Sequence, residues 1–429
     1  MSFVLSGTSG CEEGSEKTVP ALENNQIARY GRQLVFPAFG VKGQQALLNV
    51  KVLVVGIGGL GSSACLYLAS SGIGTLGLLD HDVVATSNLH RQVIHDEASQ
   101  GLMKVDSAVK RLRELNSTIR YVTHPYAMTP ENALSIVHEY DIVVDATDNV
   151  GTRYVISDAC VIAGKPVVSG AAIGMDGQIT VYNRGANSPC YRCRFPSPPK
   201  PTNARSCADA GVLGPVPGLI GVCQALEVIK IVAEMGDPLD GRIGIFDMLD
   251  ARYMVMGLND RKKDCSVCAH VHSADGKKMK PWTMADTARF LQTHGLSSKE
   301  GSPACTIASK DETKFRSISC VNFHKILKAA DQRLDKVLLL DVRPKHQYDI
   351  CSLTNSVNIP IVELKDRMSE IEEHFKRNKE TKLFTICRTG ILSQDAACLL
   401  HNMGYKDVTN ISGGLAEWSK QVDPAFPTY

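Results

Sequence analysis

The glycine-rich segment at residues 56–61 constrains the fold of this chain more than any other feature. It follows an apolar run at residues 51–55, opens a segment of helical length and has the spacing G-x-G-x-x-G. Such glycines let backbone amides approach a phosphate at a helix N-terminus, where the helix dipole supplies about half a positive charge. The spacing therefore predicts nucleotide binding that involves Gly58 and Gly59, with Asp80 at the end of the next apolar run placed to bind ribose hydroxyls.

Taken alone, this pattern fits a nicotinamide or flavin enzyme. It also fits glycines that serve only the tight packing of a helix against a strand.

Further apolar runs alternate with helix-length segments, which predicts an α/β fold with a parallel sheet. Beyond residues 51–55, these runs lie at 76–80, 141–147 and 166–169, and a helix is expected within 21–36. We assign residues 21–270 to this first domain and residues 1–20, rich in Ser, Gly, Glu and Thr, to a disordered tail.

Residues 271–317 are rich in Lys, Ser, Gly and Asp, which indicates a linker with some helix. After it, buried-strand candidates appear at 337–342, 356–359, 382–386 and 408–411. A second, smaller α/β domain is therefore expected at residues 318–429.

The charge composition gives no support to some classes of partner. The 47 basic and 45 acidic residues leave a net charge of +2, which gives no electrostatic reason to expect direct binding to nucleic acid or a membrane. The N-terminus lacks the pattern of a signal peptide, and no run reaches about 18 apolar residues. We expect a cytoplasmic protein, in which the 14 cysteines serve metal binding and thiol chemistry instead of a disulfide framework.

A set of phosphate-binding and metal-binding residue types follows the glycines and favours chemistry at a phosphate over hydride transfer. Attack at an α-phosphate needs cations along the triphosphate and a carboxylate for Mg²⁺. Each of these residues alone would suit a solvated surface, so the ordered set carries the prediction. The set comprises Ser87, Asn88, Leu89, His90, Arg91, Lys104, Asp148 and Asn149.

Two C-x₂-C pairs predict a metal site. Cys190 and Cys193 form one pair, and Cys265 and Cys268 form the other. Together they can supply four thiolates to a tetrahedral zinc ion of structural type. A thioredoxin-like redox role is the alternative, but neither pair has the strand-to-helix context of that motif.

Two further cysteines lie where a thiol could react. Cys207 follows the proline-rich run 196–201 and precedes Gly214, so it is expected in a mobile segment. A cysteine in such a segment ordinarily has no role in catalysis. Cys387 directly follows the apolar run 382–386 and precedes a helix expected at 394–402. Backbone amides at such a turn stabilise an anion, which favours a thiolate or a persulfide.

These motifs together resemble the ubiquitin-activating-type adenylyltransferases that are fused to a rhodanese domain, over nearly all of residues 21–429. The match includes residues 29–33, 56–61, 87–92, 147–149 and 169–172, and in the second domain 340–343 and 413–418. The rhodanese-like loop departs from these relatives at Ile391 and Leu392, where they usually carry polar residues.

The resemblance implies a role for each matched residue. Asp80 would bind ribose, Arg91 and Lys104 would bind phosphates, and Asp148 would hold magnesium. Arg32 would reach the site of a neighbouring subunit, which implies a homodimer, although a surface position on a helix needs no dimer. Cys387 would carry the persulfide, and Cys207 would bond covalently to the modifier.

The function implied is ATP-dependent adenylation of the C-terminal glycine of a ubiquitin-like sulfur-carrier protein ending in Gly-Gly. Sulfur from a cysteine desulfurase or another donor would then give a thiocarboxylate, for tRNA wobble-uridine thiolation, protein conjugation or molybdopterin synthesis. An NAD(P)-type oxidoreductase and a non-catalytic scaffold remain the alternatives. The oxidoreductase leaves Asp148, Cys207 and the whole second domain without a role.

Overall fold

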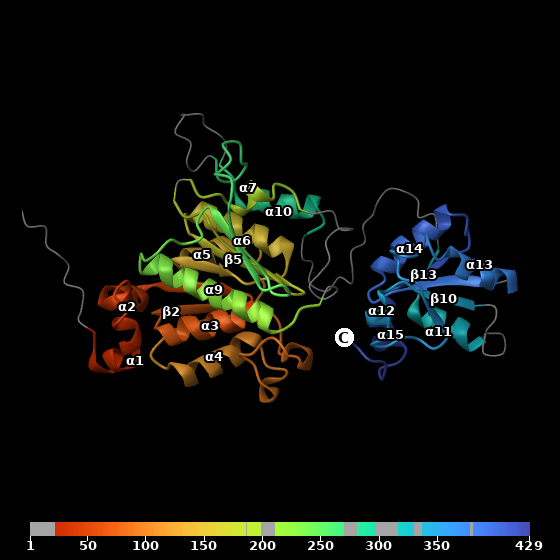
Figure 1. The fold of residues 1–429 in the computed structure, drawn as a ribbon, viewed down its shortest axis with the longest axis horizontal. Helices are drawn as coiled ribbons and strands as arrows, with labels where there is room; N and C mark the ends of the chain where they lie inside the picture. Colours follow the sequence, from red (N-terminus) through yellow and green to blue (C-terminus); the bar gives the residue numbers. More distant parts are fainter. Residues whose placement is uncertain are drawn as a thin grey trace, which may run out of the picture. The chain divides into compact units, whose positions relative to one another are not determined.

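The computed structural model describes residues 22–185, 187–198, 211–269, 281–296, 316–329, 337–377 and 381–429. The chain divides into two compact units, Met1–Ser298 and Lys299–Tyr429, which are drawn in Figure 1. The tail expected at residues 1–20 lies outside the described residues, as do Cys207 and much of the expected linker.

The first unit is built on an eight-stranded sheet with the order β3-β2-β1-β4-β5-β6-β7-β8. The first five strands in this order are parallel, as predicted, and β6, β7 and β8 extend the sheet in antiparallel fashion. The strands are β1 (Lys51–Val55), β2 (Thr75–Leu79), β3 (Arg120–His124), β4 (Ile142–Asp145), β5 (Val167–Ile173), β6 (Asp176–Tyr182), β7 (Arg242–Asp247) and β8 (Arg252–Gly257).

Helices cover both faces of this sheet (Figure 1), because alternate side chains of its buried strands point to opposite sides. Val52 and Val54 pack with α3 (Gly59–Ser71), α4 (Lys104–Leu115) and α9 (Pro215–Val232). Leu53 and Val55 pack with α5 (Ala133–His138), α6 (Val150–Ala163) and α10 (Met284–Thr293). The remaining helices are α1 (Asn24–Leu34), α2 (Gly40–Asn49) and α7 (Tyr191–Arg194), with short 3₁₀ turns at Thr86–Asn88 and Glu97–Ser99.

The strand order places a crevice beside β1. The chain moves outward from β1 to β2 and β3, then returns to add β4 on the other side of β1. In open α/β sheets, ligands bind at the carboxyl ends of the strands where this order reverses. The topology therefore predicts a ligand-binding site at the loops that follow β1 and β4.

Helix α9 satisfies the length and composition of a membrane span, and it does so alone among the described residues. It packs against α3 and β5, and Ile220, Ala225 and Val228 belong to buried clusters of the first unit. We therefore interpret it as a core helix of the α/β unit.

The second unit contains a five-stranded sheet with the order β11-β10-β12-β13-β9, in which all neighbouring strands are parallel. One face packs against α14 and α13, and the other against α11 and α15. The elements are β9 (Arg316–Ser319), α11 (Cys320–Ala329), β10 (Val337–Asp341), α12 (Lys345–Tyr348), β11 (Ser356–Asn358), α13 (Met368–Arg377), β12 (Lys382–Ile386), α14 (Ile391–Asn402), β13 (Thr409–Ser412) and α15 (Gly414–Gln421).

Several elements differ from the sequence-based expectation. No strand was expected at β3, β6, β7, β8 or β9, and two helices add detail to what was expected. Helix α14 begins at Ile391, three residues before the predicted start, because Gly390 adopts a left-handed conformation and lets the helix begin directly after the Cys387 turn. Helix α10 lies within the segment expected to be a linker with some helix, and it packs on α6.

Candidate functional site

The turn between β1 and α3 leaves no room for side chains at two of its glycines. A Cβ on Gly61 would lie 1.9 Å from the Gly56 carbonyl oxygen, and Gly56 itself has a φ of +89°. The turn can therefore be this tight only with glycine at both positions. It directs the N-terminus of α3, a helix of 13 residues, into the crevice beside β1.

Two buried side chains hold the backbone of Ile57 in this turn. Asp80 accepts a hydrogen bond from the Ile57 amide at 2.7 Å, and the His95 Nε2 lies 3.2 Å from the Ile57 carbonyl oxygen. Burial lowers the pKa of His95, so the imidazole is neutral at pH 7. Since a carbonyl oxygen only accepts, Nε2 carries the ring proton and Nδ1 accepts from the Ser107 hydroxyl at 2.9 Å.

Lys104, the first residue of α4, brings a cation to the same crevice. Its amine lies 2.8 Å from an Asp82 carboxylate oxygen, and the residue is only 6% exposed. Partial burial acts to raise the pKa of Asp82, but the hydrogen bond and charge of Lys104 outweigh it and hold that pKa below its usual range. Arg91 lies nearby on the wall of the crevice, where its guanidinium donates to the Ser87 carbonyl oxygen at 2.7 Å.

The loop that carries Asp148 is held by a buried polar network at the end of β4. Asp145 accepts hydrogen bonds from the Thr147 amide and hydroxyl, and Arg153 donates to the carbonyl oxygens of Thr147 at 2.7 Å and of Gly170 at 3.0 Å. Asn149 caps α6 by accepting from a backbone amide. Asp148 itself is exposed and faces a cavity, so its carboxylate is available to a ligand.

These loops enclose a cavity of about 660 Å³, large enough for a nucleotide and part of a second substrate. Eight of the predicted site residues line it: Gly58, Gly59, Asp80, Asn88, Arg91, Lys104, Asp148 and Asn149. Four others do not line it: Arg32, Ser87, Leu89 and His90. Arg32 lies exposed in the last turn of α1.

Several residues that shape this cavity were given no role from the sequence. Gln92, within the matched stretch 87–92, is buried in the cavity wall, and its side-chain oxygen has no hydrogen-bond partner within the described part of the chain. An unpaired buried acceptor that lines a cavity fits a ligand that donates a hydrogen bond. Arg153 and Asp82 were also missed, although both lie within five residues of predicted ones.

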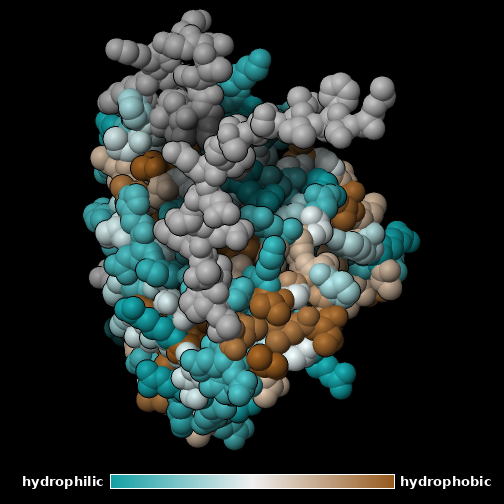
Figure 2. All heavy atoms as spheres, turned by 90° about the vertical axis from the view of Figure 1, so that its left-hand side faces the viewer, coloured by the Kyte–Doolittle hydropathy of each residue, from teal (hydrophilic) through white to brown (hydrophobic). Residues whose placement is uncertain are grey.

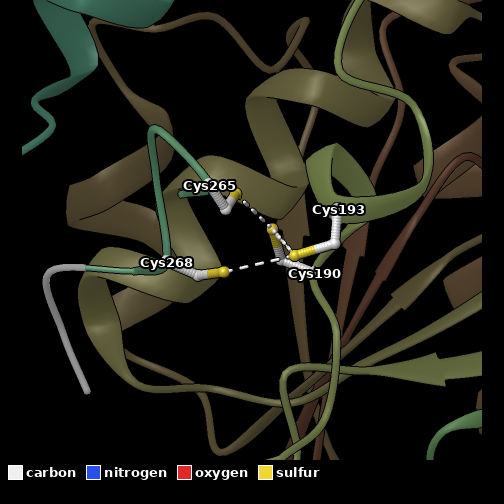
Figure 3. A group of neighbouring side chains, drawn as sticks. All are labelled: Cys190, Cys193, Cys265 and Cys268. Atoms are coloured by element: carbon white, nitrogen blue, oxygen red, sulfur yellow. Dashed lines mark hydrogen bonds between the residues drawn. The ribbon is translucent and has the colours of Figure 1, made fainter. Parts of the chain in front are cut away.

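The four cysteines of the two C-x₂-C pairs converge, and Figure 3 shows their sulfurs facing one another from two separate segments of the chain. The sulfur–sulfur distances are 3.8 Å for Cys190–Cys193, 3.7 Å for Cys190–Cys265 and 3.4 Å for Cys193–Cys268. A tetrahedral zinc ion with bonds of about 2.3 Å requires edges of about 3.8 Å, whereas a disulfide requires about 2.0 Å. All four residues are buried, so the donor set and its geometry fit zinc.

An ion pair beside this cluster joins it to two helices. Arg192, between two of the cysteines, donates to both carboxylate oxygens of Asp158 in α6 at 2.8 Å. Its guanidinium lies 3.8 Å from the Phe290 ring centroid, and Thr287 of α10 also donates to Asp158. Burial acts to raise the pKa of Asp158, and Arg192 opposes this shift by favouring the charged carboxylate.

We expect Asp158→Ala to lower the free energy of unfolding by about 3–5 kcal/mol, because it leaves the Arg192 charge buried without a partner. Urea unfolding followed by fluorescence measures this change. The matched control is Glu114→Ala, which removes the exposed Arg111–Glu114 pair and is expected to cost at most about 1 kcal/mol. Equal losses of unfolding free energy in the two variants would contradict the prediction that the buried pair contributes more to stability than the exposed pair.

In the second unit, Cys387 lies in a turn at the carboxyl end of β12 and is 2% exposed. Its sulfur accepts a hydrogen bond from the Gly390 amide at 3.1 Å, and its carbonyl oxygen accepts from the Leu415 amide at 2.9 Å. A Cβ on Gly414 would lie 2.3 Å from this carbonyl oxygen, so α15 approaches the turn closely. The arrangement can stabilise an anionic sulfur.

Ile391 and Leu392, the two apolar residues that follow this turn at the start of α14, have different surroundings. Leu392 packs against the core between the sheet and α14, whereas Ile391 is 54% exposed.

Two family models match the chain. The ThiF family matches residues 30–267, and the rhodanese-like domain matches residues 325–421. The fold and the two sites therefore define a class of protein in which an adenylation unit of the ThiF family is joined to a rhodanese-like sulfurtransferase unit.

Relatives of nearly full length define the family within this class. The chain is 44% identical over 426 residues to "Adenylyltransferase and sulfurtransferase MOCS3" from Arabidopsis thaliana, covering 96% of this chain and 88% of the relative. It is 41% identical to proteins of the same name from Danio rerio and Dictyostelium discoideum, covering 95% of this chain and 88% and 98% of those proteins. The chain belongs to this MOCS3 family and is an adenylyltransferase and a sulfurtransferase.

Among solved structures, the chain is similar to a crystal structure of E. coli MccB with AMPCPP and MccA. The TM-score is 0.50 at 25% identity, covering 58% of this chain and 75% of that one. Neither MccB nor the relatives above are named as oxidoreductases, so the alternative of an NAD(P)-type oxidoreductase gains no support.

Proposed function

We propose that the first unit adenylates the C-terminal glycine carboxylate of a ubiquitin-like sulfur-carrier protein ending in Gly-Gly, and that the second unit supplies sulfur to form a thiocarboxylate. The observation that carries this proposal is the presence in one chain of a cavity lined by Lys104, Arg91 and Asp148 and a turn that can hold an anionic sulfur on Cys387. The first suits chemistry at a phosphate, and the second suits sulfur transfer.

In the proposed adenylation step, an acceptor carboxylate oxygen attacks the α-phosphorus of ATP and pyrophosphate leaves. Gly58, Gly59 and the N-terminus of α3 approach the phosphates, and Lys104 and Arg91 offset the charge that develops on them. Asp80 binds the ribose, and Asn88 and Asn149 complete the wall, with Ser87, Leu89 and His90 supporting Arg91. Asp148 has the oxygen donor and the exposure to hold Mg²⁺, which when bound would neutralise phosphate charge.

Arg32 lies on α1, outside the cavity of its own chain, which agrees with a role in the site of a second subunit. The surroundings of Arg32 support this proposal, because Ile27, Val35, Phe36 and Val41 are all at least 47% exposed. The face of the molecule that carries α1 and α2 includes a hydrophobic patch (Figure 2). A homodimer would bury such a patch and bring Arg32 towards a partner's nucleotide.

In the proposed sulfur transfer, the persulfide on Cys387 attacks the activated carbonyl and AMP leaves, which gives an acyl disulfide. Cys207 either receives the acyl group first, as a thioester, or cleaves the acyl disulfide and releases the thiocarboxylate. The second route leaves a Cys207–Cys387 disulfide that a thiol reductant must reduce. Cys207 lies outside the described residues, but Gly211 pairs with Gly174 beside the cavity, and four residues span at most about 14 Å.

The other proposed assignments follow from these roles. The four cysteines bind a structural zinc ion, and the enzyme acts in the cytoplasm. Residues 271–317, whose helix α10 packs on the first unit, link the unit at 21–270 to the unit at 318–429. A cysteine desulfurase or another donor loads Cys387, and the product serves tRNA thiolation, protein conjugation or molybdopterin synthesis. No direct contact with nucleic acid or a membrane is proposed.

Intact-mass spectrometry of the acceptor tests the proposal. The full chain is mixed with Mg-ATP, thiosulfate and a ubiquitin-like protein ending in Gly-Gly, and the acceptor is expected to gain the mass of one sulfur replacing one oxygen. Cys387→Ala should abolish this gain and leave acceptor-dependent pyrophosphate exchange intact. Cys398→Ser, which changes an exposed cysteine of the same unit, is the matched control and should leave both unchanged.

Each failure in this experiment has a distinct meaning. Pyrophosphate exchange without a mass gain would refute the sulfur-transfer half for this acceptor, and no exchange with any Gly-Gly acceptor would refute the adenylation half. A mass gain that persists in Cys387→Ala would refute the assignment of Cys387.

A further inference from the structure

Tyr429 contacts two arginines near the catalytic turn of the second unit. Its hydroxyl accepts a hydrogen bond from Arg343 at 2.6 Å, and the Arg388 guanidinium lies 5.3 Å from the centroid of its ring. Arg388 is the residue that follows Cys387. No motif in the sequence marks Tyr429, since it lies 42 residues beyond Cys387.

Arg343 provides a rigid anchor for Tyr429. It is 1% exposed, pairs with both carboxylate oxygens of Asp341 and donates to the backbone oxygens of Gln347 and Cys351. The Val342 amide donates to the Ile386 carbonyl oxygen, so Arg343 and Cys387 both follow the carboxyl ends of neighbouring parallel strands. The Arg343 side chain therefore lies at the sheet edge that carries the catalytic turn.

The segment before Tyr429 is also held in place. The Val422 and Asp423 amides donate to the Trp418 carbonyl oxygen, and Phe426 packs against the cluster that contains Trp418. The Cys351 thiol lies 3.7 Å from the Pro427 carbonyl oxygen. These contacts fix the approach of the segment, so the Tyr429 ring has a defined position beside Arg388.

We propose that Tyr429 is a positioning residue for sulfur transfer, which holds the guanidinium of Arg388, a residue of the Cys387 turn, so that it binds the anionic sulfur donor. The negative face of a tyrosine ring attracts a guanidinium at this distance. The backbone of Arg388 is fixed as well, because its carbonyl oxygen accepts from the Ala416 amide at 2.9 Å. Arg388 is half-buried, so a small anion can reach its side chain from solvent.

The reaction that exposes this role is the transfer of sulfur from thiosulfate to cyanide. The Cys387 thiolate attacks the outer sulfur of thiosulfate, the sulfur–sulfur bond breaks, and sulfite leaves with the electron pair. Cyanide then attacks the outer sulfur of the persulfide, and thiocyanate forms as the Cys387 thiolate leaves. The first step brings a dianion to the turn, so a fixed guanidinium should favour it most.

The test measures kcat/KM for thiosulfate in the full chain over a range of salt concentrations. Tyr429→Leu should lower this value about three- to tenfold and flatten its decrease with salt, because Arg388 is no longer held where the dianion arrives. Tyr429→Phe loses the hydrogen bond to Arg343 but keeps the ring and the contacts of the preceding segment, so it should retain more of the value than Tyr429→Leu. Tyr405→Leu, a half-buried tyrosine that packs on Phe375 in the same unit, is the matched control for lost stability.

A double-mutant cycle with Arg388→Met separates positioning from general packing. In that background Tyr429→Leu should have little further effect on kcat/KM for thiosulfate. Three results would overturn the proposal: additive losses in the cycle, a salt dependence in Tyr429→Leu that matches the wild-type chain, or a Tyr429→Phe variant as impaired as Tyr429→Leu. Melting temperatures of all variants show whether a loss of folding accounts for any of them.

Discussion

Replacing Lys104 by Ala is expected to slow acceptor-dependent pyrophosphate exchange by about 10²–10³-fold. Lys104 is a buried cation in the wall of the cavity, and a preorganised charge aimed at the developing negative charge of a transition state has an effect of this size. Exchange of labelled pyrophosphate into ATP, measured with and without a Gly-Gly acceptor, gives the rate. The loss should appear mainly in kcat, because the charge on the α-phosphate is greatest in the transition state.

The control for this variant is Lys110→Ala on the same helix. Lys110 is exposed on α4 and does not line the cavity, so its loss should leave the exchange rate within about twofold of the wild type. Asp82→Asn removes the partner of Lys104 and keeps its charge, so we expect a smaller loss than in Lys104→Ala. Equal rates in Lys104→Ala and Lys110→Ala would contradict the assignment of Lys104.

Replacing Cys268 by Ser is expected to release the metal and to unfold the first unit at temperatures where the wild-type chain is folded. Structural zinc sites supply about 10–16 kcal/mol of binding free energy, whereas whole domains are stable by only about 5–15 kcal/mol. The four thiols join the segment of residues 190–193 to that of residues 265–268, which are 75 residues apart. Metal content by atomic emission and a thermal unfolding scan measure the two effects.

The control for the zinc prediction is Cys223→Ser in α9. Cys223 is half-buried in the same unit and lies outside the cluster, so this variant should keep its metal and most of its melting temperature. Adding a strong chelator to the wild-type chain should lower its melting temperature, and added zinc should restore it. An unchanged metal content in Cys268→Ser would refute the four-thiolate site.

The placement of residues within a local motif could be predicted from the sequence. The glycines at 56–61, the two C-x₂-C pairs and the Cys387 turn each carry their chemistry within a few residues, and the structure places them as those motifs indicate. The strands β1 and β12 were predicted at the residues where they lie, because continuous apolar runs mark strands buried on both faces.

Elements without such a run were missed. Strand β8 is exposed along its whole length, so burial imposes no apolar pattern on it. Strands β6 and β7 join the sheet through antiparallel neighbours, whereas the prediction considered only parallel strands that alternate with helices. Contacts between distant residues were missed for a different reason. Gln224 donates to the Asp145 carbonyl oxygen from 79 residues away, and nothing near either residue in the chain marks the pair.

The sequence by itself determined which charged side chains, thiols and candidate metal ligands each motif offers, because these depend only on residue type. Tertiary structure decided which of them meet. It brought Lys104, Asp148 and the glycine turn around one cavity, left Arg32 outside it, and placed Tyr429 against Arg388. The physical reason is that side-chain chemistry is local, whereas contacts between distant residues depend on how the sheet and its helices pack.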